Sequence, residues 1–244
     1  MQRYFWLALL FFVNVEQLSA QQDTVVIEKK PKQSLFKKAI IPTTFILSGI
    51  ILNNTQTEKD WQKDIRNKVG NDYENSIDDY LQYVPHVQVY IGDIVGIKAK
   101  NHWFDQTKNI FISSVLTGIV IQSFKRGVGK ERPDASNNHS FPSGHTATAF
   151  TGATVLYYEY KDTSPVYAYS GYLFATATGG LRVINNKHWV SDVLAGAGVA
   201  MLATALVYHI EPLKNWNPFK KTKNLTFSPM INGYDVTFVA TLKF

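Results

Sequence analysis

The sequence predicts a mainly α-helical protein, an up-and-down bundle of five to six core helices followed by a C-terminal β-hairpin. Four apolar runs of helical length predict the bundle, at 110–124, 146–158, 166–181 and 193–208. They are rich in Ala, Gly, Ser and Thr, whose small side chains allow helices to pack closely. The 244 residues are 45% hydrophobic and 18% charged, which is enough for one core and excludes a disordered or fibrous chain.

The first twenty residues predict a secretory signal. Arg3 precedes the apolar run 4–13, and polar residues follow up to the small Ala20. The run is shorter than the roughly 20 residues that span a membrane, so an uncleaved anchor is the weaker interpretation. We therefore expect an exported protein with a signal at 1–20 and an exposed, lysine-rich lead-in at 21–38.

A helical domain is expected at 39–210. It begins with the apolar segment 39–52, a mostly polar segment at 53–79 and a mixed segment at 80–97. Each of the four later runs covers about 20 to 24 Å at about 1.5 Å per residue, against a hydrocarbon core of about 30 Å. They are marginal as membrane spans, so an integral membrane protein and a soluble or peripheral one stay equally open.

The tail at 211–244 has a different pattern. From Tyr234 onward apolar and polar residues alternate with a period of two, and Asn232-Gly233 before them is a type I′ turn signal. A hairpin is predicted, with 224–231 as its first strand. Two strands cannot close a membrane barrel of eight or more, so the hairpin is expected to pack on the bundle or on a partner.

The composition excludes several kinds of active site and partner. The absence of cysteine excludes disulfides, thiolate metal sites, iron–sulfur clusters and cysteine nucleophiles. The balance of 25 Lys+Arg against 19 Asp+Glu gives a net charge of +6, which suits an anionic partner. Nucleic acid is not expected, because the basic loop at 125–133 lacks interleaved stacking aromatics and export removes the usual targets.

The sharpest local motif is Pro142-Ser143-Gly144-His145, just before an apolar helical run. A Ser and a Gly at a helix start offer free N–H groups and little bulk to an anionic oxygen. Taken alone, a serine-capped helix start with a surface histidine is the commoner explanation.

Two further clusters strengthen the functional interpretation. The loop 125–133 holds four cations and one anion, and Arg182 is followed by His188 and Asp192 at i and i+4. In an up-and-down bundle, the ends of the first and third apolar runs and the starts of the second and fourth lie together. We therefore expect both histidines, the cations and the carboxylate to converge on one anion site.

Such a site suits phosphate chemistry. Lys125, Arg132 and Arg182, with the N–H groups at the helix start, can neutralise phosphate oxygens without a metal, and no metal motif is present. His188, oriented by the carboxylate, would attack phosphorus, and a protonated His145 would donate to the departing oxygen.

The three motifs resemble the signature of the type 2 phosphatidic acid phosphatases, a superfamily that also includes bacterial non-specific acid phosphatases and vanadium haloperoxidases. The resemblance covers about 110–208 and implies a helical bundle, a phosphohistidine intermediate and no metal cofactor, although vanadate could occupy the phosphate site. One departure is visible, since Leu181 stands where the family usually has Ser before the arginine. The implied catalytic residues are His188, His145 and Asp192, and the implied phosphate-binding residues are Lys125, Arg132, Ser143, Gly144 and Arg182.

The expected function is a metal-independent hydrolase of a phosphomonoester or pyrophosphate in the bacterial envelope, membrane-associated with a periplasm-facing site. Its expected partner is a lipid phosphate, such as lipid A, a prenyl pyrophosphate or phosphatidate. A soluble periplasmic acid phosphatase acting on small esters is the main alternative. A vanadate-dependent haloperoxidase and a non-catalytic lipid-binding envelope protein are the others.

Overall fold

The computed structural model describes residues 34–210, 225–232 and 235–242. In this part of the chain there are eight helices and two strands. Their bounds are α1 (Leu35–Leu52), α2 (Gln56–Val69), α3 (Ile77–Leu81), α4 (Val84–Ile94), α5 (Trp103–Val128), α6 (Gly144–Tyr160), α7 (Pro165–Ile184), α8 (Val190–His209), β1 (Leu225–Asn232) and β2 (Asp235–Leu242).

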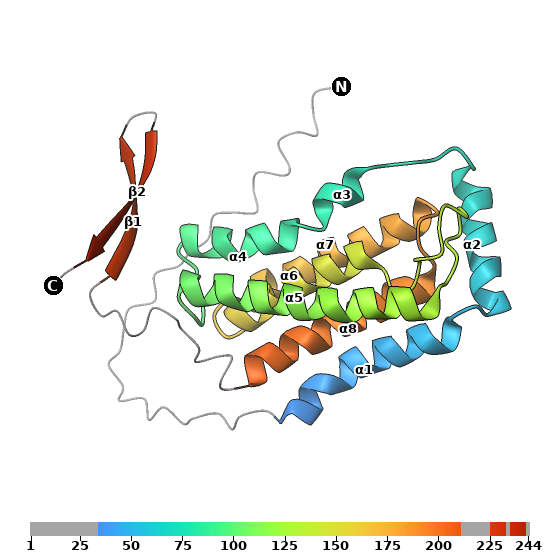
Figure 1. Cartoon of the computed structure of the whole chain (residues 1–244), viewed down its shortest axis with the longest axis horizontal. Coiled ribbons are helices and arrows are strands. Elements are labelled where there is room, and N and C mark those ends of the chain that lie inside the picture. The colour runs from blue at the N-terminus through green and yellow to red at the C-terminus, as the bar shows by residue number, and fades with distance from the viewer. Residues whose placement is uncertain (1–33, 211–224, 233–234, 243–244) are drawn as a thin grey trace, which may run out of the picture. The chain divides into compact units, whose positions relative to one another are not determined.

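Helices α5 to α8 run alongside one another and form the body of the molecule (Figure 1). Helix α6 is central, since it packs against α4, α5, α7 and α8. Helix α1 covers α8, and α2 lies across one end of the bundle (Figure 1). The mainly helical fold class is therefore confirmed, and each of the four predicted apolar runs lies within one of the helices α5 to α8.

The bundle helices are longer than the apolar runs that predicted them. Helix α5 has 26 residues, α6 has 17, and α7 and α8 have 20 each. Hydropathy missed their ends because polar residues there are buried against one another: Glu159 of α6 accepts hydrogen bonds from Asn101 at 2.9 Å and Asn109 at 3.4 Å. At about 1.5 Å per residue, α7 and α8 extend about 30 Å. Both are longer than the roughly 20 to 24 Å expected, but α8 alone among the four bundle helices is both long enough and apolar enough to cross a membrane.

The first helix also begins earlier than expected. The signal at 1–20 and most of the lead-in at 21–38 lie outside the described residues. Ser34 caps α1, because its hydroxyl accepts a hydrogen bond from the Lys37 N–H, and the helix starts at Leu35 rather than at Ala39. The mostly polar segment 53–79 contains α2 and the first residues of α3.

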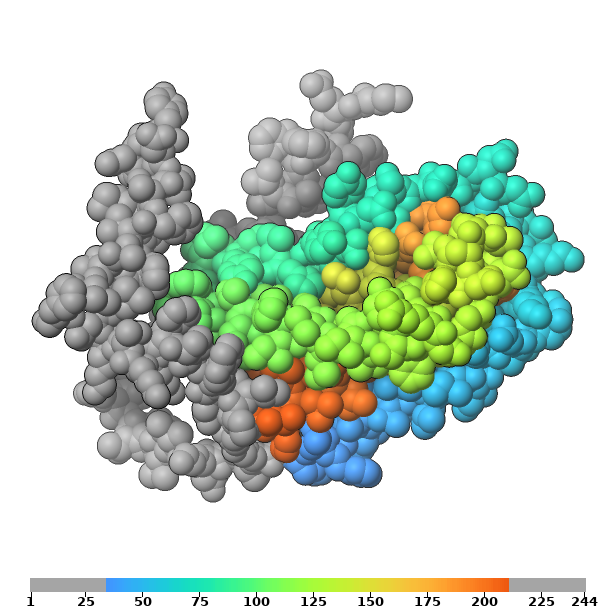
Figure 2. Space-filling view, in the orientation of Figure 1, coloured from blue at the N-terminus to red at the C-terminus, as the bar shows by residue number. Residues whose placement is uncertain are grey.

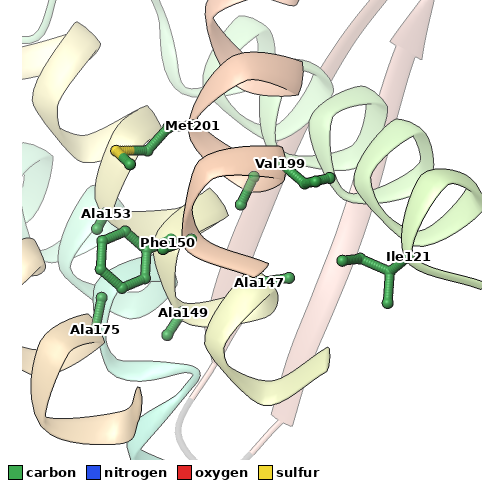
Figure 3. Packing of buried hydrophobic residues seen from close by; sticks show 10 residues of the cluster. Ile121, Ala147, Ala149, Phe150, Ala153, Ala175, Val199 and Met201 are labelled. Carbon is green, nitrogen blue, oxygen red and sulfur yellow. The ribbon is translucent and has the colours of Figure 1, made fainter. Parts of the chain in front are cut away.

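Small side chains fill the centre of the bundle. Ala153 of α6, Ala175 of α7 and Met201 of α8 lie around Phe150, and Ala147 lies on the side of α6 toward Ile121 (Figure 3). Because most of these side chains are small, the helices can pack close together. The loops at their ends are therefore fixed relative to one another.

Helix α1 approaches α8 at very short range. A Cβ at Gly49 would lie 2.7 Å from the Ser191 carbonyl oxygen, and one at Gly198 would lie 2.6 Å from the Pro42 carbonyl oxygen. No larger residue fits at either position without a shift of the backbone. This contact anchors the first turn of α8, which carries part of the predicted site.

Among the described residues, two helices, α1 and α8, are long and apolar enough to cross a membrane by length and composition. Core helices of soluble proteins share both properties, and most of α8 is buried inside the bundle. Helix α1 is different, because it exposes Ile41, Leu47 and Ile51. This unpaired apolar face is the stronger sign of contact with a membrane.

The two strands pair antiparallel, with Leu225 opposite Leu242 and Asn232 opposite Asp235. The lysine-rich part of the tail at 211–224 and half of the predicted Asn-Gly turn lie outside the described residues. The confirmed part of the fold class rests on the helices alone. The packing of the hairpin on the bundle or a partner stays a prediction.

Candidate active site

The helix ends that carry the predicted site residues gather at one end of the bundle. The loop 129–143 lies beside the end of α7, the start of α8 and helix α2 (Figure 1). On the face seen in Figure 2, parts of α6 and α7 are visible in a hollow between α3 and the end of α5. The alternation of the helices thus brings together segments that are far apart in sequence.

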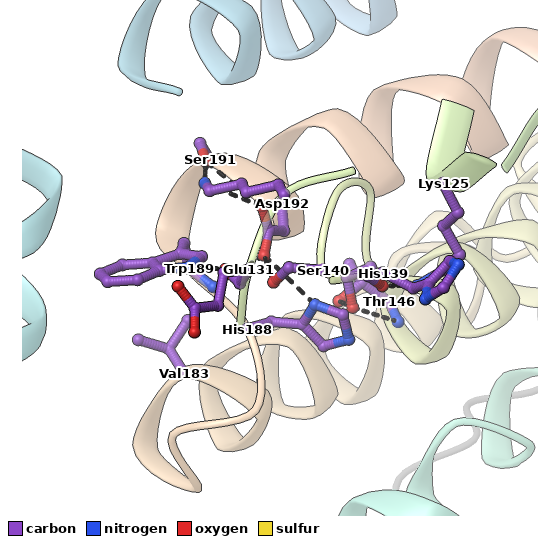
Figure 4. Close-up of polar contacts among 12 residues, drawn as sticks. Lys125, Glu131, His139, Ser140, Thr146, Val183, His188, Trp189, Ser191 and Asp192 are labelled. Carbon is purple, nitrogen blue, oxygen red and sulfur yellow. Dashed lines mark hydrogen bonds and ion pairs between the residues drawn. The ribbon is translucent and has the colours of Figure 1, made fainter. Parts of the chain in front are cut away.

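Asp192, in the first turn of α8, is the centre of a buried hydrogen-bond network (Figure 4). Its Oδ2 accepts from the backbone N–H of Trp189 at 2.9 Å, from the Ser140 hydroxyl, and from Nδ1 of His188 at 3.3 Å. Its Oδ1 lies 3.0 Å from Nζ of Lys130. Both oxygens are therefore engaged, and the carboxylate has a fixed orientation toward His188.

This environment keeps His188 neutral. Burial lowers the pKa of His188 to about 4, against the opposing effect of Asp192, and the charges of Lys125 and Arg182 lower it further. Because Nδ1–H donates to Asp192, the lone pair of the neutral ring is on Nε2. His188 can therefore act as a nucleophile through Nε2 at neutral pH.

Three cations from separate elements surround this pair. Burial lowers the pKa of Lys125 to about 8, and the charges of Arg132 and Arg182 lower it further, against Asp192. Burial also lowers the pKa of Arg132, and the charge of Arg182 adds to the effect. Lys125 and Arg132 are therefore each destabilised by neighbouring positive charges. An anion bound among them would relieve this repulsion.

Two of the cations also have buried donors without a partner among the described residues. These are the Nε atoms of Arg132 and Arg182. Lys125 is held in place by donating to the His139 carbonyl at 2.5 Å, and Arg182 by pairing with Asp78 at 2.7 Å. Unsatisfied buried donors on arginine match the oxygens of a phosphate group.

At the start of α6, one of the N–H groups expected to bind an anion is already engaged. The Ser143 N–H donates to the Asp192 carbonyl at 2.9 Å, so it is not available to an anion. Its Oγ caps the helix by accepting from the N–H and the hydroxyl of Thr146, at 3.4 and 2.9 Å. A Cβ at Gly144 would meet nothing within 4 Å. The Ser143 hydroxyl hydrogen and the Gly144 N–H remain as donors next to this open space.

His145 has a different environment from His188. Its Nε2 lies 2.8 Å from Oδ1 of Asp79 on α3, and its side chain is 30% exposed against 2% for His188. Burial and the charge of Arg182 lower the pKa of His145, whereas Asp79 raises it. A partly exposed imidazole with a carboxylate partner can exchange a proton with solvent, which suits an acid rather than a nucleophile.

Sequence reasoning missed the ion pair between Glu58 and Lys130. It counted Lys130 among the cations of an exposed loop, but the side chain is buried, with Nζ 3.0 Å from Oε2 of Glu58 and 2.7 Å from the Ser191 hydroxyl. The same ammonium contacts Asp192 at 3.0 Å. Lys130 therefore joins two buried carboxylates and connects α2 to the carboxylate that orients His188.

The local sequence around Glu58 predicts the start of a helix but not the ion pair of its carboxylate. The Thr55 hydroxyl accepts from the Glu58 N–H at 3.2 Å, and the Glu58 carboxylate accepts from the Asn54 N–H at 3.1 Å. This is a variant of the T-x-x-E pattern of a helix N-terminus, in which the carboxylate binds the N–H of the residue before the cap. Nothing in that pattern indicates that the carboxylate is buried against Lys130.

One group of described residues has the closeness of metal ligands. Ligand atoms of Asp78, Asp79 and His145 lie within 4.8 Å of one another. However, Arg182 donates to one oxygen of Asp78 at 2.7 Å and Asn185 to the other at 2.9 Å. A guanidinium at this distance opposes a metal cation, so the group is better explained as an ion-pair cluster that orients Arg182 and His145.

Residues 106–216 match the sequence profile of the PAP2 superfamily. The chain is 36% identical over 152 residues to a lipid A 1-phosphatase of Porphyromonas gingivalis, in a match that covers 62% of this chain and 34% of the relative. It is 32% identical over 119 residues to a lipid A 1-phosphatase of Rhizobium etli, covering 41% of this chain and 49% of the relative. The chain thus spans less than half the length of either relative.

A solved structure shares the fold. It is a transmembrane PAP2-type phosphatidylglycerolphosphate phosphatase from Bacillus subtilis, with a TM-score of 0.50 and 20% identity. The match covers 69% of this chain and 94% of that structure. At this identity the likeness concerns the helical architecture alone.

Proposed function

We propose that the chain is a member of the PAP2 superfamily, whose profile matches residues 106–216, and that it is a metal-independent phosphatase acting on a lipid phosphate. One observation carries this proposal: a buried, neutral His188 held by Asp192 lies in the field of Lys125, Arg132 and Arg182. This combines a nucleophile with a phosphate-binding cation cluster, and it needs no metal to balance the substrate's charge.

In the first step, Nε2 of His188 attacks phosphorus while the phosphate oxygens are bound by the three cations. An N–P bond forms and the P–O bond to the lipid breaks. The leaving oxygen takes a proton from His145, so it departs as a neutral hydroxyl. Asp192 stabilises the positive charge that develops on the His188 ring.

In the second step, water attacks the phosphorus of the phosphohistidine. His145, now neutral, accepts a proton from the water, the N–P bond breaks, and inorganic phosphate leaves. His188 is again neutral and His145 again protonated, so the cycle closes without a cofactor. Vanadate, a tetrahedral anion like phosphate, would compete for the same site.

The proposed substrate rests on the names of the relatives and on the exposed apolar residues of this chain. The curated relatives are named lipid A 1-phosphatases, which makes a lipid A 1-phosphate the first substrate to test. Exposed apolar residues on α1 and α5, such as Ile51 and Phe111, support a membrane-associated enzyme. The predicted signal at 1–20 supports export and a periplasm-facing site in the bacterial envelope.

The test is phosphate release by the purified protein from lipid A, prenyl pyrophosphate, phosphatidate and a soluble nucleotide. We expect turnover of a lipid phosphate without added metal and in the presence of a chelator. His188→Ala should abolish turnover, whereas the matched variant His209→Ala, in the last turn of α8, should not. Radiolabelled phosphate should be trapped on the native protein but not on His188→Ala.

Other outcomes of these assays would support a different function. Turnover of nucleotides but not lipids would indicate a soluble-type acid phosphatase. Bromide oxidation dependent on added vanadate would indicate a haloperoxidase. A protein that binds lipid but releases no phosphate from any substrate would refute the enzymatic proposal.

A further inference from the structure

A large cavity lies between α1, α7 and α8, apart from the catalytic residues. Its volume is about 980 Å³, and its lining includes Phe45, Val183, Leu194 and Met201. The proposed nucleophile, acid and phosphate-binding cations do not line it. Cavities of about 300–1,000 Å³ with mainly apolar walls are typical of ligand sites.

The cavity is elongated. Along α7, the lining residues run from Tyr169 to Ile184, which at about 1.5 Å per residue corresponds to about 22 Å. Gly180 lies in this stretch, is exposed, and would have no atom within 4 Å of an added Cβ. The cavity is therefore an elongated groove, and we call it the groove below. It is longer than one leaflet of a bilayer's hydrocarbon core, about 15 Å, and can accept an extended acyl chain.

Lysines line one end of the groove. Lys37 and Lys38 come from the first turn of α1, and Lys161 follows the last residue of α6. The Lys161 ammonium lies 5.2 Å from the centroid of the Tyr158 ring. Burial lowers the pKa of Lys161, against the opposing charge of Asp162. An anionic group here would stabilise these charges while its apolar part occupied the groove.

This end is distant from the proposed phosphate site. His145 is in the first turn of α6 and Lys161 caps its other end, so the 17-residue helix separates them by about 25 Å. A substrate whose phosphate lies at His188 would place no charge beside Lys161. The charge of the occupant must therefore be that of a different molecule.

We propose that the groove between α1, α7 and α8 binds one anionic phospholipid as an accessory ligand, with its headgroup phosphate at Lys37 and Lys161 and an acyl chain between α7 and α8. The far end of the groove is lined by Val183 and Val190. Val183 follows Arg182 in α7, and Val190 begins the helix that carries Asp192. An acyl chain here fills space beside both segments and supports their spacing.

The test measures lipid retention by the full chain, purified in a non-ionic detergent and analysed by native mass spectrometry. The probes are phosphatidylglycerol and phosphatidylcholine with identical acyl chains. We expect one tightly retained phosphatidylglycerol, preferred about tenfold or more over phosphatidylcholine through two lysines. Because the readout is binding and not turnover, failure of this proposal is distinct from failure of the proposed phosphatase.

Gly180→Trp should fill the groove and abolish retention of both lipids. Its matched control is Gly118→Trp, because Gly118 is also an exposed helical glycine with no atom within 4 Å of an added Cβ, but lies on α5 outside the groove. Circular dichroism would establish that each variant is folded. Retention by a folded Gly180→Trp equal to that of Gly118→Trp would overturn the proposal.

A second pair of variants tests the charged end without changing the groove's shape. Lys37→Gln/Lys161→Gln should remove the preference for phosphatidylglycerol, whereas Lys59→Gln/Lys63→Gln, with the same charge change on the exposed face of α2, should keep it. Equal retention of the two lipids by the native protein would refute the proposal. So would a particle of doubled mass that retains no lipid, because a second copy of the chain would then cover the groove.

Discussion

Replacing Lys130 by methionine should destabilise the protein strongly. The ammonium lies 3.0 Å from both Glu58 and Asp192, and all three side chains are almost completely buried. The substitution keeps the volume of the side chain but leaves two buried carboxylates without their shared cation. Breaking a buried pair in this way typically costs about 3–5 kcal/mol, a large part of the roughly 5–15 kcal/mol that keeps a domain folded.

For a chain of this size each kcal/mol corresponds to about 2–4 °C in Tm, so Lys130→Met should lower the Tm by roughly 6–20 °C. Thermal unfolding followed by circular dichroism measures this. The matched control is Lys187→Met. Lys187 pairs with Asp134 at 3.1 Å and with Glu74 at 3.5 Å, but its partly exposed pairs are worth only about 0–1 kcal/mol.

The double variant Glu58→Gln/Lys130→Met separates electrostatics from packing. Neutralising Glu58 returns the network to one net negative charge, so the double variant should be more stable than Lys130→Met alone. A Tm for Lys130→Met within about 2 °C of the native value would refute the reasoning. So would a double variant less stable than the single one, because the loss would then be one of packing.

Lys130→Met should also affect turnover, since it acts through Asp192. We expect kcat to fall by about tenfold to hundredfold while KM changes little, as is typical when the group that orients a catalytic residue is lost. A parallel rise in KM would mean instead that Lys130 contributes to substrate binding.

Four further predictions concern the proposed reaction. Asp192→Asn should lower kcat by about 10⁴-fold, because the amide cannot hold the same tautomer of His188, and single-turnover kinetics would detect it. The profile of kcat/KM against pH should be bell-shaped, falling below pH about 4 as His188 becomes protonated and falling again at a pH below 6.5 as His145 loses its proton. Asp79→Asn should shift this alkaline limb to lower pH, since Asp79 raises the pKa of His145. Arg132→Lys should weaken inhibition by inorganic phosphate about tenfold to hundredfold in competition assays, because the unpartnered Nε–H is lost.

The sequence was sufficient to predict the helical bundle and the meeting of its ends. Apolar runs mark helices wherever the buried residues are apolar, and alternation of direction then places Lys125, Arg182 and the start of α6 together. It underestimated helix lengths wherever the buried residues are polar. Glu159 is the clearest case, because its partners Asn101 and Asn109 come from distant positions and no local pattern reveals them.

Partners that are distant in sequence also explain why three carboxylates at the site were not predicted. Glu58, Asp78 and Asp79 lie in the mostly polar segment 53–79, for which the sequence predicted no role at the site. Each finds a cation or a histidine only after α2 and α3 fold against the bundle. A buried charge has no local sequence signature, because its partner is defined by the tertiary fold. The Ser143 N–H was misassigned for a similar reason, since its acceptor is the Asp192 carbonyl on another helix.

The family match begins at residue 106, yet two of the carboxylates that balance the site lie before it. Lys130 is paired with Glu58 of α2, and Arg182 with Asp78 of α3. The bundle segment supplies the proposed phosphate-binding cations, and the pKa of Lys125 is lowered first by burial and then by the charges of Arg132 and Arg182. The N-terminal helices contribute compensating negative charge through Glu58 and Asp78. Asp78 accepts from Nη1 of Arg182 at 2.7 Å, whereas the buried Nε of the same guanidinium has no partner among the described residues and so remains available to a phosphate oxygen.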